Sequence, residues 1–492
     1  MVRTPYGRGF PWAHLYGVAF AEQGFHVLLQ SCRGTGGSTG RFEPFRHEAA
    51  DGQAAVAWLR EQDWFTGRLG MIGASYLAYV QLALAGDPPP ELKAAVVQVG
   101  ISDPAAFAYP GGVFALANVL SAAAAAFSGQ GLLRAARALV RLQLRFKRSA
   151  RILPLRQACR EALGGPVPFV EEFLDHEDAT DGYWQAIRPD LAGWRVPTAL
   201  QGGWHDAALD QTLAQYAALR AGGCDVSLLI GPWSHASAFS RDGLVTVSRE
   251  ALAWMTGRLA GEAAAADLRR APVRVHVGGA AQWRDLEAWP PHDGSQAWYL
   301  NGGGLSREAR DGTGSSSLRY DPADPTPSVG GQLLSPQAGP QDNRALEARP
   351  DVLVFTSDPL PDPLDVLGPV RAELHLRAST SRAHVFARLC DVDTDGRSRN
   401  VTDGIVRLAS GAPGLQTVIV RMSSAAHQFA PGHRLRLQVS GGAYPRFARN
   451  TGTGEPLATA TRLVPTDIEV YHDPARPSAL LLPARPPAGA AG

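Results

Sequence analysis

The chain has 492 residues, with 47 basic and 46 acidic side chains and a formal net charge of +1 at pH 7. This near balance argues against a nucleic-acid-binding protein, which carries an excess of Lys and Arg. Hydrophobic residues make up 45% of the chain and charged residues 19%, so the composition is that of a folded protein and not of a disordered one. At about 150 residues per domain, the length predicts roughly three domains.

Lysine and cysteine usage argues against several kinds of site. Lys93 and Lys147 are the two lysines, and neither lies in a Gly-x-x-x-x-Gly-Lys-Ser/Thr loop that would bind phosphate. The wide separation of the cysteines excludes zinc-type and redox-type spacing, so we expect free thiols in a cytoplasmic protein. No His-Glu-x-x-His motif is present, and we expect no metal and no cofactor. The cysteines are Cys32, Cys159, Cys224 and Cys390.

Strand and helix patterns alternate in two stretches of the chain. Such alternation is typical of βαβ units and predicts a parallel sheet. The first stretch, residues 1–103, holds predicted strands at 24–30, 68–73 and 92–99 and a predicted helix at 47–62. The second stretch, residues 195–265, holds predicted strands at 196–202 and 226–231 and a predicted helix at 210–220. We interpret the two stretches as one α/β core.

The rest of the chain has other patterns. Residues 104–194 are mostly helical in pattern and predict a helical insertion in the core. Within them, residues 104–133 carry no charged side chain, but Pro, Gly and a bulk of Ala favour a buried or pocket-covering helix over a membrane span. Residues 268–482 change to a period of two, with short strands between Gly, Pro and Asp turns, which predicts an all-β sandwich.

Ser75 is the candidate nucleophile. It follows a predicted buried strand that ends at Gly73, and a helical pattern begins near Tyr76. A sharp strand-to-helix turn exposes a serine hydroxyl above the edge of the sheet. Leu77 occupies the position of the usual second glycine, so the motif alone also fits an ordinary turn.

Asp206 and His235 are the candidate partners of Ser75. In this architecture the chain order is Ser, then Asp or Glu, then His, each just past a strand. The motif Gly202-Gly-Trp-His-Asp206 follows one predicted strand, and Gly231-Pro-Trp-Ser-His235 follows the next. His235 would take the Ser75 proton, and Asp206 would orient the imidazole. His205 and Asp210 compete for these roles in the same loop.

With these motifs in order, the sequence resembles the CocE/NonD serine hydrolases. This group includes cocaine esterase, α-amino-acid ester hydrolases and Xaa-Pro dipeptidyl-peptidases. The resemblance covers nearly the whole chain. The matching stretches are 3–8, 33–40, 48–52, 73–81, 203–206, 231–235, 388–396 and 432–437.

The resemblance implies an α/β-hydrolase core, a helical cap and a C-terminal jelly-roll domain. The implied domains are 1–103 and 195–265 for the core, 104–194 for the cap and 268–482 for the jelly roll. The resemblance also implies an oxyanion hole formed by the Tyr6 hydroxyl and the backbone N–H of Tyr76.

The sequence departs from the family pattern in three places. Ala78 replaces a glycine after the serine turn, and Ser31 replaces an Asp, which removes an expected buried charge partner of Arg33. Relatives also have strands before the tyrosine motif, so we expect that the reading frame extends upstream of Met1. Without those strands, Tyr6 is expected to lie on a frayed end of the chain.

Two other motifs favour ordinary structural roles. Asp391-Val-Asp-Thr-Asp-Gly396 copies half of a calcium loop, but Thr402 stands where a bidentate Glu is needed, so a β-turn is expected. An acidic run in the predicted cap favours a solvated helix face over capture of a substrate ammonium. Its members are Glu171, Glu172, Asp175, Glu177, Asp178 and Asp181.

The sequence therefore predicts a serine hydrolase that cleaves a carboxylic ester or amide through an acyl-enzyme. A carboxylesterase is favoured, with an Xaa-Pro dipeptidyl-peptidase or an amino-acid ester hydrolase or acylase as alternatives. The expected partner is a small ester or amide or a short peptide, with no nucleic acid and no membrane. A catalytically inactive homologue that acts as a binding protein stays open as a different class.

Overall fold

The computed structural model describes residues 1–127, 132–149, 151–260, 271–309, 314–409 and 414–484. These residues form two compact units. The first unit comprises Met1–Phe107, Val119–Lys147 and Arg160–Arg274. The second comprises Ala108–Asn118, Arg148–Cys159 and Val275–Gly492.

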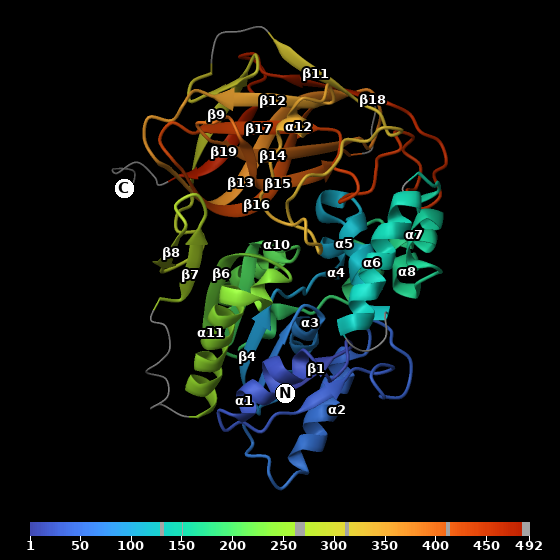
Figure 1. The fold of residues 1–492 in the computed structure, drawn as a ribbon, viewed down its shortest axis with the longest axis vertical. Helices are drawn as coiled ribbons and strands as arrows, with labels where there is room; N and C mark the ends of the chain where they lie inside the picture. Colours follow the sequence, from blue (N-terminus) through green and yellow to red (C-terminus); the bar gives the residue numbers. More distant parts are fainter. Residues whose placement is uncertain (128–131, 150, 261–270, 310–313, 410–413, 485–492) are drawn as a thin grey trace. The chain divides into compact units, whose positions relative to one another are not determined.

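A parallel sheet forms the centre of the first unit. Strands β3, β4, β5 and β6 lie side by side in this order, as the alternation of strands and helices predicts. Of these strands, β4 and β6 are labelled in Figure 1. Their bounds are Leu69–Ala74, Leu92–Gln98, Thr198–His205 and Val226–Ser234. Residues 94–97 of β4 are completely buried, which is typical of a parallel strand covered by helices on both faces.

Helices cover this sheet. Helix α3 contacts β3 and β4, α10 contacts β5 and β6, and α11 contacts β3, β4 and β5. The bounds are Tyr76–Leu82 for α3, Leu209–Ala221 for α10 and Arg241–Leu259 for α11. Helix α2, Glu48–Arg60, confirms the helix predicted at 47–62 and buries Ala55, Val56 and Leu59 on one face.

A short parallel pair, β1 (Val2–Thr4) and β2 (Leu29–Ser31), accompanies this sheet. The strand predicted at 24–30 is wrong in its bounds, because β2 extends only as far as it has a three-residue partner in β1. Val2, Arg3 and Thr4 are almost completely buried, so the strand that leads into Tyr6 is packed on all sides and not frayed. A six-residue helical turn, Ala13–Val18, and the single turn α1, Ala19–Ala21, join the pair.

The segment between β4 and β5 is helical, as predicted. Pro168 begins α8, where a missing N–H costs nothing, and the Asp181 side chain caps α9 by accepting from the Tyr183 N–H. Residues 114–116, 119 and 120 are buried, which confirms a buried apolar segment; residues 128–131 lie outside the described residues. None of the described helices combines the length and the apolar composition that a bilayer crossing requires. The bounds are α4 Pro104–Ala108, α5 Leu116–Phe127, α6 Leu132–Ser149, α7 Leu155–Leu163, α8 Pro168–Asp175 and α9 Gly182–Ala186, with 3₁₀ turns at Pro110–Gly112 and Leu191–Gly193; a further 3₁₀ turn, Ser237–Phe239, precedes α11.

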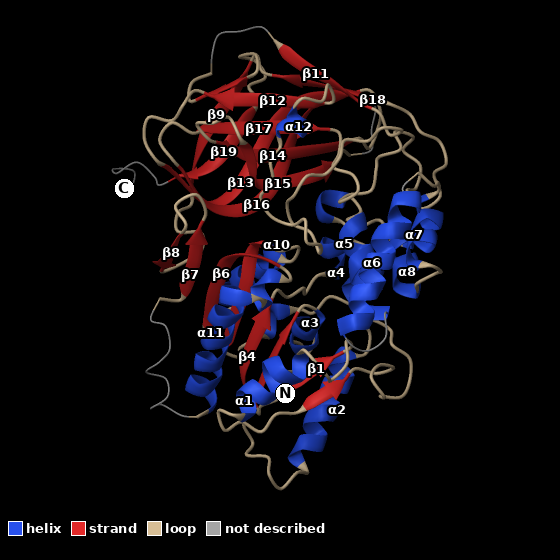
Figure 2. Cartoon of the chain, viewed as in Figure 1, coloured by secondary structure: helices blue, strands red, loops and turns tan. Residues whose placement is uncertain are grey.

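The second unit is dominated by antiparallel strands (Figure 2). The 15-residue strand β13 pairs with β16, β18 and β19, and its residues alternate between buried and exposed as the period of two predicts. The inward side chains pack into one apolar core that includes Leu374, Phe429 and Leu437. The bounds are β9 Gly294–Asn301, β10 Gly304–Ser306, β11 Ser315–Tyr320, α12 Arg344–Glu347, β12 Val352–Ser357, β13 Leu364–Ala378, β14 His384–Val392, β15 Ser398–Arg407, β16 Leu415–Phe429, β17 Arg434–Ser440, β18 Thr466–Tyr471 and β19 Ala479–Ala484. Strands β7, Val273–Val277, and β8, Gln282–Leu286, follow β6 in the order of its sheet.

The loop that resembles half of a calcium site is a hairpin turn. It joins β14 to β15, and the Gly396 N–H donates to the Asp393 carbonyl, which confirms the expected β-turn. Asp391 accepts from two imidazoles, that of His427 at 2.8 Å and that of His433 at 2.7 Å. Both oxygens of this carboxylate are therefore engaged by protein groups.

Asp403 is a buried carboxylate of the second unit that pairs with two arginines. Its carboxylate accepts from Arg388 at 2.9 Å and from Arg446 at 2.5 Å, and the side chains are 2%, 1% and 6% exposed. Burial opposes ionisation, but the two guanidinium groups outweigh it and hold the pKa of Asp403 below its ordinary value.

We expect Asp403→Asn to lower the free energy of unfolding by about 3 kcal/mol at pH 7, because it leaves two arginines buried without a counter-charge. The carboxylate's contribution is complete above the ordinary Asp pKa of about 3.9 and disappears as the pH falls through the lower folded-state value. Urea unfolding at pH 7 and near pH 3 measures the loss of free energy. The control is Asp467→Asn, which removes the partner of Arg319 from an exposed ion pair. Equal losses in both variants would contradict it.

Candidate active site

Ser75 lies on the sharp turn between β3 and α3. Its backbone angles are φ 60° and ψ −121°, a conformation that non-glycine residues rarely adopt. The Ser75 N–H donates to the Gln98 carbonyl at 2.9 Å, and the Ser75 carbonyl accepts from the N–H groups of Ala78 and Tyr79 in α3. Strain of this kind persists only where the surroundings impose it, and it is the geometry that presents a nucleophile at a strand end.

Small residues around the turn make this geometry possible. A Cβ atom at Gly73 would lie 2.4 Å from the Leu77 Cβ, so no side chain fits at that position. Leu77, which stands where the motif usually has glycine, is fully buried against the sheet. The departure of Leu77 from the usual motif is therefore accommodated by packing.

Ala78, which replaces a glycine of the family pattern, lies opposite Gly100. A Cβ at Gly100 would lie 2.6 Å from the Ala78 Cβ and 2.8 Å from Val97 Cγ1. Gly100→Ala is expected to lower the free energy of unfolding by about 2 kcal/mol through overpacking. Adding Ala78→Gly should restore part of that loss, because only the contact with Val97 then remains. Denaturant unfolding measures both; a double variant no more stable than the single one would contradict this complementarity.

Tyr6 follows β1 and meets the serine turn. Its hydroxyl lies near the Ser75 side chain and the backbone N–H of Tyr76, and both groups act to lower its pKa. Burial raises the pKa of Tyr6 and outweighs the opposing effect of these two groups, so the hydroxyl keeps its proton at neutral pH. The Tyr6 ring stacks on Trp12, and its backbone N–H donates to the Thr4 side chain, which holds it in place.

Asp206 and His235 form a hydrogen-bonded pair. The His235 Nδ1 lies 2.7 Å from an Asp206 carboxylate oxygen, and Asp206 is completely buried while the His235 side chain is 22% exposed. The two competing residues are placed differently, because Asp210 is exposed in the first turn of α10 and His205 is the last residue of β5. The carboxylate that faces His235 is therefore that of Asp206.

Glycines allow the strands that precede Asp206 and His235 to approach each other closely. A Cβ at Gly203 would lie 2.2 Å from the Trp233 carbonyl oxygen, and one at Gly231 would lie 2.4 Å from the Trp233 ring. The ends of β5 and β6 can therefore approach closely, and His205 pairs in register with Ser234. The residues that follow these strands are Asp206 and His235.

An apolar cluster joins the Ser75 region to the Asp206 loop. Tyr76, Ile101 and Ala208 are buried in it, and the rings of Tyr6 and Phe107 pack against it. Ser75 follows β3, Asp206 follows β5 and His235 follows β6, so all three lie at the carboxyl edge of one parallel sheet. This is the edge at which open α/β sheets bind ligands.

Glu48 supports this region, and the sequence motifs gave it no role. Its carboxylate accepts from the Tyr76 hydroxyl at 2.8 Å and forms a buried ion pair with Arg3 at 3.0 Å. The Tyr76 hydroxyl in turn accepts from the Phe45 N–H at 2.8 Å, and Phe45 has a φ of 71°. Glu48 thus fixes the residue whose N–H meets Tyr6; its only sequence signal was its place in a matching stretch.

The expectation that Arg33 lacks a charge partner is wrong. Its guanidinium forms an ion pair with Asp51 on α2, and its side chain is 48% exposed, so a partner at position 31 is not required. The Ser31 hydroxyl lies 3.5 Å from the Gly36 carbonyl instead. The buried charge pair of this region is Arg3 with Glu48.

Several members of the acidic run are engaged within the protein. Glu171 pairs with Arg160, and Asp181 pairs with His176. Glu172 accepts from Arg46 at 3.3 Å and from the Tyr183 hydroxyl at 2.9 Å. These three carboxylates already have partners within the protein, which argues against their binding a substrate ammonium.

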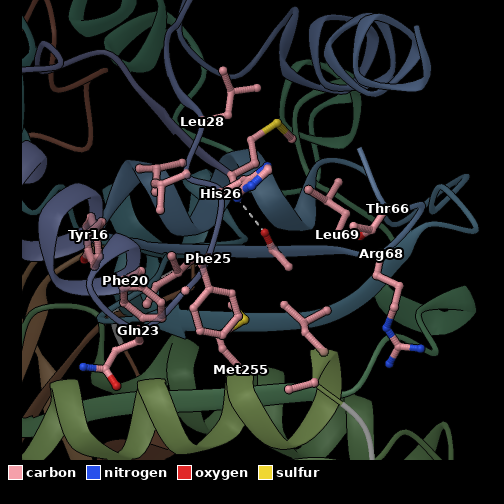
Figure 3. A pocket seen from close by; sticks show the side chains of 18 of the residues that line it. Tyr16, Phe20, Gln23, Phe25, His26, Leu28, Thr66, Arg68, Leu69 and Met255 are labelled. Carbon is pink, nitrogen blue, oxygen red and sulfur yellow. Dashed lines mark hydrogen bonds between the residues drawn. The ribbon is translucent and has the colours of Figure 1, made fainter. Parts of the chain in front are cut away.

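A pocket of about 370 Å³ lies beside β3 and the start of the chain (Figure 3). Tyr16, Phe20, Phe25 and Met255 line it, together with Leu69 at the start of β3. Ser75, Asp206 and His235 are not among its lining residues. It is therefore separate from the candidate catalytic groups.

Comparisons with known proteins agree with this architecture. The family model of the X-Pro dipeptidyl-peptidase (S15 family) matches residues 1–237, and that of the X-Pro dipeptidyl-peptidase C-terminal non-catalytic domain matches residues 267–481. Cocaine esterase of Rhodococcus sp. (strain MB1 Bresler) is 31% identical over 546 residues, covering 98% of this chain and 93% of that protein.

Solved structures share the fold over the same length. An aminopeptidase from a Thaumarchaeota archaeon has a TM-score of 0.83 at 21% identity, covering 98% of this chain and 90% of its own. An α-amino acid ester hydrolase has a TM-score of 0.76 at 23% identity, covering 98% and 91%.

The sheet, the helical insertion and the β-sandwich together define an α/β-hydrolase core with a C-terminal all-β domain. With the matches above, the protein is a serine hydrolase. The chain belongs to the CocE/NonD family, as its motifs led us to expect.

Proposed function

We propose that Ser75, His235 and Asp206 form the catalytic triad of a carboxylesterase. Ser75 Oγ attacks the carbonyl carbon of the ester while His235 takes its proton, and the imidazolium is stabilised by Asp206. Collapse of the tetrahedral intermediate expels the alcohol, which receives the proton from His235. Water then cleaves the acyl-enzyme under His235 base catalysis, releasing the acid and restoring Ser75.

The observation that carries this proposal is the convergence of Tyr6 on the serine turn. Its hydroxyl lies near both the Ser75 side chain and the Tyr76 N–H, the two groups that act to lower its pKa. The Tyr6 hydroxyl and the Tyr76 N–H would both donate to the oxyanion of the intermediate. Such donors stabilise charge that develops during the reaction. Donors on both sides of a candidate nucleophile have no role in an ordinary strand-to-helix turn.

The favoured substrate is a small ester with an apolar acyl group. Partly buried rings of Phe42, Phe45 and Phe107 pack around Tyr76, next to Ser75. Apolar walls with a few placed polar groups are the usual lining of small-molecule sites. The 31% identical relative is also an esterase by name.

Xaa-Pro dipeptidyl-peptidase activity is the second candidate, because both family models carry that description. Such an enzyme must bind a substrate ammonium, and the ion pairs of Glu171, Glu172 and Asp181 weigh against these carboxylates in that role.

Hydrolysis of a short acyl p-nitrophenyl ester and of a Gly-Pro p-nitroanilide separates the two activities. We expect the ester to give the higher kcat/KM by at least a hundredfold. Comparable or faster cleavage of the anilide would replace the esterase assignment.

A further inference from the structure

Helix α6 carries a row of arginines that the catalytic proposal does not use. Arg134, Arg137, Arg141 and Arg145 follow one another at intervals of three and four residues. At 100° per residue they fall within about 80° of the helix circumference, and at 1.5 Å per residue the row is about 16 Å long. The four side chains therefore form one straight stripe of positive charge.

This stripe lines a groove. The groove has a volume of about 530 Å³ and is completed by Ala123 and Ala124 of α5 and by Ala162, Leu163 and Val167. No acidic residue is among its lining residues, and no ion pair joins the four arginines to a carboxylate within the described part of the chain. Arginines of other helices, such as Arg60 on α2 and Arg160 on α7, do pair with carboxylates.

We propose that this groove binds an elongated small polyanion with a chain of phosphate groups. Guanidinium groups bind phosphate through paired hydrogen bonds, and four in a row exceed what one phosphate can contact. The volume is that of a small-molecule site. The apolar wall opposite the arginines leaves room for an uncharged portion of the ligand.

An anionic lipid surface is the competing occupant. Leu133, Val140 and Leu144 are 73%, 55% and 64% exposed on the same helix, and basic helices with exposed leucines bind membranes. The arginines line a concave groove walled by other segments, however, and a flat bilayer cannot enter it. The geometry therefore favours a free polyanion.

Calorimetric titration with inorganic tripolyphosphate at physiological ionic strength tests the proposal, since exposed charges far apart are screened there. We expect binding to be at least tenfold tighter than that of orthophosphate. Arg137→Gln/Arg141→Gln should weaken it at least tenfold. The control Arg371→Gln/Arg377→Gln, which removes two exposed charges from β13, should change it less than twofold.

Three results would overturn the proposal. The first is the absence of tripolyphosphate binding to the folded wild type. The second is an equal loss in both double variants, which would reveal attraction by overall charge. The third is α6-dependent sedimentation with phosphatidylglycerol vesicles that tripolyphosphate does not compete away, which would assign the helix to a lipid surface. Thermal unfolding of each variant verifies that the fold is retained.

Discussion

We expect Asp206→Asn to lower kcat on an activated ester about 10⁴-fold while the protein stays folded. The Asp206 carboxylate accepts from His235 Nδ1 at 2.7 Å and is completely buried. An amide in its place favours the imidazole tautomer that cannot take the Ser75 proton, and it no longer stabilises the imidazolium. Stopped-time hydrolysis of a p-nitrophenyl ester measures the effect.

The control for this prediction is Asp210→Asn. Asp210 is four residues further along the chain and exposed, and by sequence it competes with Asp206 for the role. We expect its kcat to stay within about twofold of the wild type. A large loss with Asp210→Asn and a small one with Asp206→Asn would exchange the two roles and contradict the structure.

Tyr6→Phe lowers kcat about 10²–10³-fold with little change in KM, because one oxyanion donor contributes that much to the rate. The hydroxyl stays protonated because burial raises the pKa of Tyr6, so it can donate to the oxyanion over the neutral range. The loss falls on kcat because the charge that it stabilises is absent from the bound ester. Steady-state kinetics over a substrate series measures both constants.

Tyr16→Phe is the matched control for Tyr6→Phe. Its hydroxyl is also buried and donates to the Gln98 side chain at 2.6 Å, whereas the Ser75 N–H is held by the Gln98 backbone carbonyl, which this substitution leaves in place. We expect this variant to lose stability but to keep its turnover. Reaction of Ser75 with an organophosphorus probe should survive in Tyr6→Phe, and an unchanged kcat in that variant would remove Tyr6 from the site.

The strand ends that precede Ser75, Asp206 and His235 could be predicted from the sequence. Ser75, Asp206 and His235 were predicted because buried apolar runs end just before them, and strand ends of a parallel sheet meet at one edge. The structure pairs the two that are closest in the fold, Asp206 and His235. Tyr6 has no such signal, since an aromatic residue after Pro5 is most often packing, and only the family resemblance singled it out.

The support behind the site could not be predicted from the sequence. Glu48 reaches Tyr76 only because α2 packs where it does, and nothing in a helix pattern predicts which neighbour a polar residue meets. The same holds for Arg33, whose partner Asp51 lies 18 residues away on α2. The departure at Ala78 could be noticed in the sequence, but its counterpart, Gly100, is found only from the packing of α3 on β4.

Intact-mass analysis after treatment with a fluorophosphonate tests the central claim most directly, with wild-type protein compared with Ser75→Ala. The proposed mechanism predicts one adduct per chain on the wild type and none on the variant, because only a serine with an adjacent base attacks such a probe. The absence of an adduct on a well-folded wild type, or equal labelling of both proteins, would contradict the assignment of Ser75 as the nucleophile.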